Sequence, residues 1–146
     1  MSPIRVLLVT ADSTIEHSVI TAVEQTSDMI IAAQAATGPG ALQVCEATHP
    51  DMVILDADQT GLKLAEITRA IRQNHPQTKI LVCAHTPAQL DTVLKAGAHS
   101  YLLNNTLPED LVAALHSTHA GKTVISLDII HHLLGFPDNS SQNFHS

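Results

Sequence analysis

Side chains that could do chemistry follow several short apolar runs of this sequence. Asp12 and Asp56 come just after or at the end of two runs, His85 follows a third, and Asn104 follows a fourth. Carboxylates can bind a divalent cation or pair with an imidazole, whereas an uncharged amide can only form hydrogen bonds. A site built from these residues therefore requires a fold that brings the ends of the runs together.

Histidines form the second group of candidates, with ten among 146 residues. Protonating all ten would move the formal charge from -7 to +3, so mild acid should affect the whole molecule. His116 and His119 share a helix face, but this spacing alone is weak evidence for a metal site, and we predict none. We expect most histidines to be exposed on helices and turns. His85 is of more interest, because it could pair with Asp56 or Asp58.

Common enzyme motifs are missing from the chain. It has no GxGxxG, no GxxxxGKS or GxxxxGKT and no GxSxG, and the TGPG segment at 37–40 is typical of a turn that opens a helix. We therefore expect neither a hydrolase nor a nucleotide-binding enzyme, and no cofactor.

Five apolar runs, rich in Val, Ile and Leu, predict the strands of a buried sheet. They span residues 4–9, 29–35, 52–55, 80–83 and 100–103. Segments with helical spacing follow them, at residues 13–25, 38–48, 62–74, 87–97 and 107–120. Because parallel strands need a long connection and a helix supplies it, this alternation predicts an α/β fold, a doubly wound parallel sheet of five strands with five helices.

In such a sheet the functional crevice lies at the carboxyl ends of the strands. The residues that the pattern places there are Thr10, Ala11, Asp12, Asp56, Ala84, His85, Asn104 and Asn105. The helix ends support the pattern. Thr86 before Pro87 is typical of a helix start, and Gly97 and Gly121 fall where helices should stop.

The composition limits the compartment and the partners. Fourteen acids against seven Lys and Arg repel nucleic-acid phosphate unless the cations cluster, so direct DNA binding by these residues is disfavoured. Cys45 and Cys83 lie in apolar runs without CxxC spacing and are predicted to be buried thiols. No signal-peptide pattern and no stretch of about 18 apolar residues is present, so we expect a cytoplasmic protein without a membrane segment.

The segments IRVLLVTADS, HPDMVILDAD, TKILVCAHT and LKAGAHSYLLNN, in this order and spacing, resemble the receiver domain of two-component response regulators, specifically the NarL/LuxR type. The resemblance covers residues 4–120. It implies a flavodoxin-like sheet with strand order 2-1-3-4-5 and a role in signal transduction and transcription regulation. It also implies phosphoryl transfer to an aspartate at the end of the third strand, and a helix-turn-helix domain that follows the receiver.

Position by position, the resemblance shows what this chain keeps and what it lacks. Asp56 matches the phosphoacceptor, but Thr10 and Ala11 stand where receivers usually have an acidic pair that holds magnesium. Ala84 matches a Ser or Thr whose hydroxyl bonds the phosphoryl group, and Asn104 matches a lysine that supplies a positive charge. The chain therefore retains the acceptor and lacks most of the groups that assist the transfer.

Tyr101 occupies the aromatic switch position of the family. Because phosphoryl transfer depends on positioning and electrostatic stabilisation, we predict an atypical receiver, or pseudo-receiver, that acts without phosphorylation and without magnesium. Asp56 is then expected to be an ordinary, partly solvated carboxylate. Two alternatives stay open. One is a small-molecule or pH sensor that uses the same crevice, and the other is a conventional magnesium-dependent receiver in which Asp12 and Asp58 rebuild the acidic site.

The expected organisation is a receiver-like domain at 1–121 and a junction at 122–146. Within the junction, residues 124–134 predict a short helix with Ser126 as its cap, followed by a flexible polar tail. The expected partner is a second copy or another protein, with DNA contacts only through a C-terminal helix-turn-helix. Apolar faces on the first, fourth and fifth predicted helices could serve a dimer or the core, and the sequence does not divide these uses.

Overall fold

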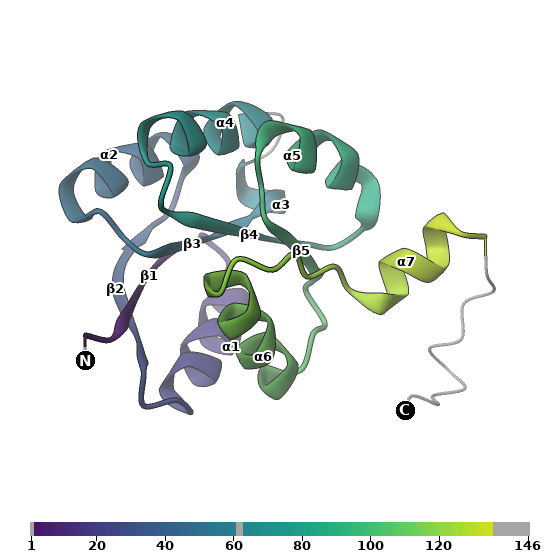
Figure 1. Cartoon of the computed structure of the whole chain (residues 1–146), viewed down its shortest axis with the longest axis horizontal. Helices are drawn as coiled ribbons and strands as arrows, with labels where there is room; N and C mark the ends of the chain where they lie inside the picture. The colour runs from purple at the N-terminus through teal and green to yellow at the C-terminus, as the bar shows by residue number, and fades with distance from the viewer. Residues whose placement is uncertain (1, 61–62, 136–146) are drawn as a thin grey trace.

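A parallel sheet forms the centre of the molecule. The structure, a computed structural model, describes residues 2–60 and 63–135 (Figure 1). Its strands are β1 (Ile4–Val9), β2 (Met29–Ala35), β3 (Met52–Asp56), β4 (Lys79–Ala84) and β5 (Ser100–Leu103). All neighbouring strands pair in parallel, in the order β2-β1-β3-β4-β5. The predicted fold class and strand order are confirmed.

The predicted helices also form, with small shifts at their ends. They are α1 (Ser13–Glu24), α2 (Gly38–Thr48), α4 (Leu64–Asn74), α5 (Leu90–Ala96) and α6 (Pro108–His119). The sequence did not predict α3 (Ala57–Thr60), a single turn after β3, whereas α7 (Leu127–Leu133) lies inside the short helix expected at 124–134. The fourth predicted helix begins as a 3₁₀ turn at Pro87–Gln89, capped by the Thr86 hydroxyl, before α5 starts.

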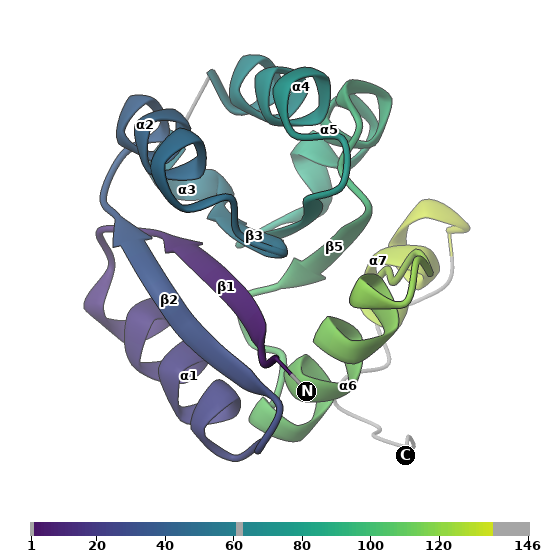
Figure 2. The same cartoon turned by 60° about the vertical axis from the view of Figure 1, so that its left-hand side comes forward.

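The helices cover both faces of the sheet, with α1 and α6 on one face and α2, α4 and α5 on the other (Figure 2). Each face has its own aliphatic core. One core packs residues such as Val19 of α1 and Leu115 of α6 against the sheet, and the other packs residues such as Ile71 of α4 and Val93 of α5. Within the described part of the chain, no helix is long and apolar enough to span a bilayer.

Local signals in the sequence set the ends of the helices. The Asp12 side chain accepts hydrogen bonds from the backbone N–H groups of Thr14 and Ile15 and so caps α1. Gly97 ends α5 at a φ of 115°, where a side chain would be strained and would also collide with Arg72. The stop predicted at Gly97 is therefore confirmed, and α6 likewise ends at His119, just before Gly121 with its φ of 95°.

The chain after α6 returns to the sheet instead of leaving it. Tyr101 N–H donates to the Val124 carbonyl at 2.9 Å, and Ser126 N–H donates to the Tyr101 carbonyl at 3.2 Å, so this segment pairs beside β5. The Ser126 hydroxyl accepts from Leu103 N–H at 3.1 Å, while its carbonyl accepts from the N–H groups of Ile129 and Ile130 in α7. The side chain predicted as a cap therefore tethers β5. The expected polar tail beyond residue 135 lies outside the described residues.

Candidate functional site

Asp56 ends the central strand β3, and its carboxylate is enclosed by protein. Thr10 Oγ1 donates to Asp56 Oδ2 at 2.7 Å, and Asp58 N–H donates to Asp56 Oδ1 at 3.0 Å. The residue is 0% exposed. The expectation of a partly solvated carboxylate was therefore wrong, because the neighbouring strand and the turn after β3 close over the side chain.

Burial raises the pKa of Asp56 above its usual value of 3.8. The hydrogen bonds from the Thr10 hydroxyl and the Asp58 N–H oppose this effect, because they favour the charged form. The negative charges of Asp58 and Asp12 add to the increase. The sequence alone suggested an ordinary carboxylate. In the structure, Asp56 is instead a carboxylate whose ionisation the fold disfavours.

The pairing of β1 with β3 explains why Thr10 reaches Asp56. Val9 lies in register with Leu55, so the next residue of each strand stands side by side at the carboxyl edge of the sheet. Thr10 also accepts a hydrogen bond from Asp12 N–H at 3.0 Å. A small hydroxyl therefore occupies the place beside the carboxylate, and Asp12 is held at the start of α1.

Asn104, at the end of β5, takes part in a second polar cluster. Its Nδ2 lies 3.3 Å from Asp58 Oδ2 and 3.2 Å from His85 Nδ1. His85 Nδ1 lies 3.7 Å from Asp58 Oδ2, so of the two carboxylates considered for His85, the structure shows the pair with Asp58. His85 is exposed and Asp58 is about half exposed, which makes this pair weak in water.

Two further positions complete the crevice. Ala84 is buried and presents a methyl group, which cannot bond to a phosphoryl oxygen. Tyr101 is also buried, and its hydroxyl donates to the Thr86 carbonyl at 2.8 Å. Burial raises the pKa of the Tyr101 phenol, which keeps it a neutral hydrogen-bond donor. The ring of Tyr101 therefore faces inward.

The residues at this edge do not fit a magnesium ion. Mg²⁺ requires several oxygen ligands in octahedral order. Here Asp12 Oδ1 caps α1, Asp56 Oδ2 accepts from Thr10, and the place of the usual acidic pair is held by Thr10 and Ala11. No group of three or more His, Cys, Asp or Glu side chains able to hold a metal occurs in the described residues.

A hollow of about 380 Å³ opens beside the polar cluster, between the start of α1 and the ends of β4 and β5. Its lining is mostly polar, with an apolar contribution from Ile15 and Leu103. The polar members are Asp12, Thr14, Ser18, His85, Asn104 and Asn105. Asn104 Oδ1 is a buried acceptor without a hydrogen-bond partner, as far as the described chain goes. The crevice therefore has room and hydrogen-bonding groups beside Asn104 and His85.

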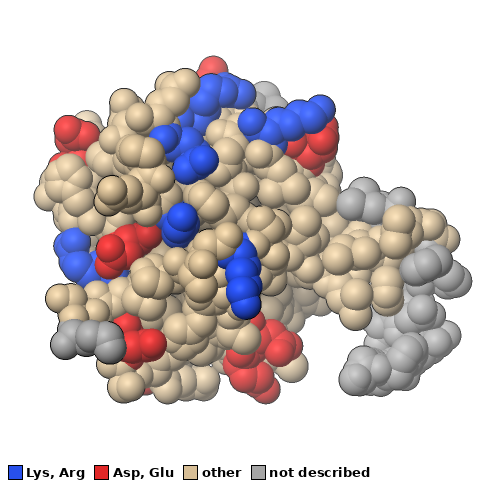
Figure 3. Space-filling view, in the orientation of Figure 1, with Lys and Arg blue, Asp and Glu red and all other residues tan. Residues whose placement is uncertain are grey.

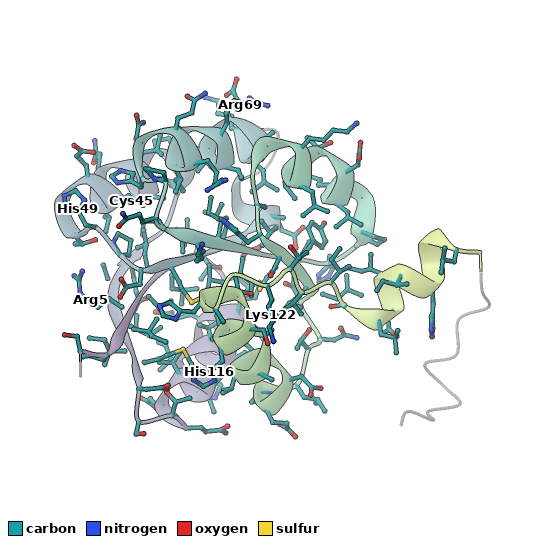
Figure 4. All side chains as sticks on the ribbon, in the orientation of Figure 1. Arg5, Cys45, His49, Arg69, His116 and Lys122 are labelled. Carbon is teal, nitrogen blue, oxygen red and sulfur yellow. The ribbon has the colours of Figure 1, made fainter. Side chains whose placement is uncertain are left out.

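The sequence placed the polar residues at one edge correctly but missed several contacts. The Thr10 bond to Asp56 was not foreseen, since no pattern shows which side chains meet across 46 residues. His75 is only 9% exposed beside Glu46, and His99 is partly buried, so these two depart from the expected exposed histidines. His116, labelled in Figure 4, binds the Asp28 carboxylate at 2.9 Å. Both cysteines are buried, as predicted.

Comparison with known proteins settles the family. The sequence model of the response regulator receiver domain matches residues 6–116. The chain belongs to this family. Among curated relatives, the receiver is 29% identical over 126 residues to the nitrate/nitrite response regulator NarL of Escherichia coli K12, covering 85% of the chain and 58% of NarL. It is 30% identical over 128 residues to the response regulator UvrY of Escherichia coli O6:H1, covering 86% of the chain and 59% of UvrY.

Solved structures agree with the sequence comparison. A LuxR-family two-component response regulator from Aurantimonas sp. SI85-9A1 matches the receiver with a TM-score of 0.80 and 27% identity, over 92% of this chain and 97% of that one. The signal receiver domain of a NarL from Mycobacterium tuberculosis matches with a TM-score of 0.77 at 23% identity, over 84% of this chain and 100% of that one, which shows the shared fold. The receiver thus resembles LuxR-type receivers, and it spans a little under three fifths of the curated relatives NarL and UvrY.

Proposed function

We propose that this receiver is an atypical one, which signals through protein contacts and does not depend on phosphorylation of Asp56. The observation that carries the proposal is the hydrogen bond from Thr10 Oγ1 to Asp56 Oδ2 at 2.7 Å. The Thr10 hydroxyl contacts Asp56 Oδ2 from the side on which receivers of this family would bind a cation. With Asp58 N–H on the other oxygen, both atoms that could attack a phosphoryl group already serve neighbouring groups.

The electrostatics of the crevice support the same proposal. Phosphoryl transfer relies on charges that stabilise the three equatorial oxygens of the transferring group. At the positions that would supply them, Ala84 offers no donor and Asn104 offers an uncharged amide that already contacts Asp58 and His85. Because Asp12, Asp56 and Asp58 bring negative charge to the same edge, an incoming phosphate would meet repulsion without a matching cation.

For the whole protein, we propose the organisation of a LuxR-type transcription regulator. The receiver unit is assigned to residues 1–121 and the junction to residues 122–146, followed in the natural protein by a helix-turn-helix that makes the DNA contacts. This rests on the likeness to NarL and UvrY, whose lengths the chain only partly covers. A cytoplasmic signalling module, rather than an enzyme, and a protein partner or second copy complete the proposal.

The test is to incubate the protein with magnesium and acetyl phosphate and to measure its intact mass. We expect no gain of a phosphoryl group, while a receiver that keeps the acidic pair, hydroxyl and lysine gains one under the same conditions. The Asp56→Asn variant serves as the matched control for the site. A phosphoryl adduct on the parent chain that disappears in Asp56→Asn would refute phosphorylation independence and favour the conventional receiver.

The hollow of about 380 Å³ beside Asn104 favours a second candidate, a receiver that senses a small polar molecule. Its buried Asn104 Oδ1 could accept a hydrogen bond from a ligand N–H group. A ligand that binds the native state raises the melting temperature. Melting curves in metabolite mixtures, with Asn104→Ala as control, separate this candidate from the first, because only the sensor would show a rise that the variant loses.

A further inference from the structure

The hollow beside Asn104 is rich in hydrogen-bond acceptors and poor in positive charge. Its volume of about 380 Å³ lies in the usual range of pockets that bind small molecules. Asp12 contributes a carboxylate to the lining, Asn104 an amide, and Thr14 and Ser18 their hydroxyls, whereas no Lys or Arg belongs to the residues that the structure places there. This lining is suited to a ligand that carries a positive charge and donates hydrogen bonds.

Asp12 has one carboxylate oxygen available for such a ligand. Its Oδ1 accepts from the backbone N–H groups of Thr14 and Ile15 at 2.8 and 3.3 Å, and so caps α1. Its Oδ2 takes part in no hydrogen bond or ion pair within the described part of the chain. Asp12 can therefore bind a cation through Oδ2 and keep the cap of α1 intact.

Asn104 supplies a second acceptor. The Asp58 carboxylate can only accept hydrogen bonds, and it lies 3.3 Å from Asn104 Nδ2, so the amide is oriented with its Oδ1 away from Asp58. This Oδ1 is buried and has no partner among the residues that the structure describes. Because an unpaired buried acceptor is unfavourable, a donor that reaches it from the hollow is stabilised there.

His85 adds no positive charge to the hollow in this arrangement. Its Nδ1 lies 3.2 Å from Asn104 Nδ2, which can only donate, so Nδ1 is the acceptor of this contact and the imidazole is neutral. The nearest charge to the ring is negative, since Asp58 Oδ2 lies 3.7 Å from the same Nδ1. The charges at this edge of the sheet therefore favour a cation.

The cations of the chain are found elsewhere on the molecule. Figure 3 shows Lys and Arg side chains spread across one face, on which Figure 4 labels Arg5, Arg69 and Lys122. These three residues come from the start of β1, from α4 and from the segment after α6, and none of them lines the hollow. A bound cation would thus meet carboxylates without a competing Lys or Arg in the lining.

We propose that the hollow binds a small primary aliphatic amine. The ammonium group donates to Asp12 Oδ2 and Asn104 Oδ1, and the alkyl chain lies against the side chains of Ile15 and Leu103, which are the apolar part of the lining. An ammonium carries three donors and needs no octahedral set of oxygens, so it fits a site that does not fit Mg²⁺. The inference rests on the second candidate function, the sensor, because it names the class of ligand.

Titration followed by ¹H–¹⁵N correlation spectra tests the site, with pentylamine as the probe. At about pH 7.5 the probe is protonated and exposed histidines are mostly neutral. The backbone amides of Thr14 and Ser18 and the side-chain amide of Asn104 should shift and saturate in the millimolar range, while the amide of Ile30 on β2 should not. Pentanoate and pentanol, at the same ionic strength, should cause no saturable shift at these residues.

Two further comparisons separate the roles of charge and chain. Asp12→Asn removes the charge but keeps a side chain that caps helices equally well, so it should raise the dissociation constant at least about fivefold. Asp91→Asn makes the same charge change at a carboxylate that is 81% exposed on α5, and it should bind like the parent. Methylamine, which lacks the alkyl chain, should bind at least about threefold more weakly than pentylamine. Melting curves establish that each variant is folded.

The proposal is overturned if pentylamine causes no saturable shift, or if pentanoate or pentanol binds equally well. It is also overturned if Asp12→Asn binds like the parent, or if the shifts spread over the acidic surface instead of the hollow. The sensor can survive this failure, since a metabolite of another class could still raise the melting temperature and lose its effect in Asn104→Ala. The acetyl phosphate test is independent of all these results.

Discussion

At the scale of single residues, the residue beside Asp56 determines how the carboxylate is stabilised. Where the family would place a carboxylate beside Asp56, this receiver has a threonine whose hydroxyl donates to it. A carboxylate next to Asp56 would repel it unless a cation stood between them, but a hydroxyl stabilises the charged form directly. In this receiver a protein hydroxyl, and not a second carboxylate, therefore contacts Asp56 at this position.

The raised pKa of Asp56 predicts a pH-dependent stability. The folded state holds the proton at a pH where the unfolded chain, with a carboxyl pKa near 3.8, has released it, so Asp56 lowers stability as pH rises through its folded pKa. Asp56→Asn removes this charge. We expect the variant to be more stable than the parent at pH 7 to 8, with the difference shrinking toward about pH 4. Urea unfolding at several pH values measures it.

The control for this prediction is Asp91→Asn, which changes a carboxylate that is 81% exposed on α5. It should move stability little, and with no comparable pH trend. A gap between Asp56→Asn and the parent that stays constant across this pH range would show that the charge of Asp56 is not what the fold resists.

At the scale of elements, β4 and β5 are joined by a side chain as well as by their ladder. His99 lies just before β5, and its ring Nδ1 accepts a hydrogen bond from the Ile80 backbone N–H at 3.0 Å. The backbone N–H of His99 donates to the Ile80 carbonyl at 2.9 Å. Burial, together with the charges of Arg72 and Lys79, lowers the pKa of His99 to about 4. A proton on Nδ1 would also turn this acceptor into a donor facing another donor.

His99 therefore predicts an acid-sensitive strand pair. Between the unfolded pKa of 6.5 and the folded value of about 4, the unfolded state binds the additional proton, so stability falls as pH is lowered through this window. The loss should reach about 1–3 kcal/mol, allowing for partial exposure of the ring. His99→Asn, whose Oδ1 can replace Nδ1 as acceptor, should reduce this loss in thermal unfolding curves recorded from pH 7 to pH 4.

His17→Asn is the comparison for His99→Asn, because His17 is exposed on α1. Its pH profile should follow that of the parent. If His99→Asn and His17→Asn gave the same profile, the acid sensitivity would have to come from groups other than His99.

At the scale of the whole molecule, the segment after α6 belongs to the packing of the receiver. Ile129 enters the core on the α4 and α5 side, far along the chain from the residues that it contacts. The Ser100 hydroxyl accepts from Val124 N–H and bonds to the Thr118 hydroxyl, so the same segment is also connected to α6. The junction and the sheet should therefore unfold together.

A pair of neighbouring isoleucines tests this statement. Ile129→Ala removes a fully buried side chain and should lower the free energy of unfolding by about 2–5 kcal/mol. Ile130→Ala, at 37% exposure, should lower it by less than about 1 kcal/mol at concentrations where the chain is monomeric. Urea unfolding followed by circular dichroism gives both values. Equal, small effects would mean that α7 is only loosely attached.

The sequence predicted the layout well and the contacts poorly, for a physical reason. Strands and helices follow from the local period of apolar residues, so the edge that carries Asp56 and Asn104 could be placed correctly. Whether Asp56 is buried depends on the register of β1 against β3, which brings Thr10 to it from 46 residues away. The burial of His99 likewise depends on a neighbouring strand. Such contacts arise from packing between elements, which no local pattern encodes.

The pairing of Ile125 with Tyr101 has a mechanical consequence. The bridge places Tyr101 beside the segment that leads into α7, a helix about 10 Å long. A rotation of β5 by about 10° would swing the far end of the helix by roughly 2 Å. Because the Tyr101 hydroxyl donates to the Thr86 carbonyl, a change at the end of β4 can reach α7 through the Tyr101 ring and β5. Tyr101 thus connects Thr86, which follows β4, through its hydroxyl with the segment that leads into α7, through its backbone.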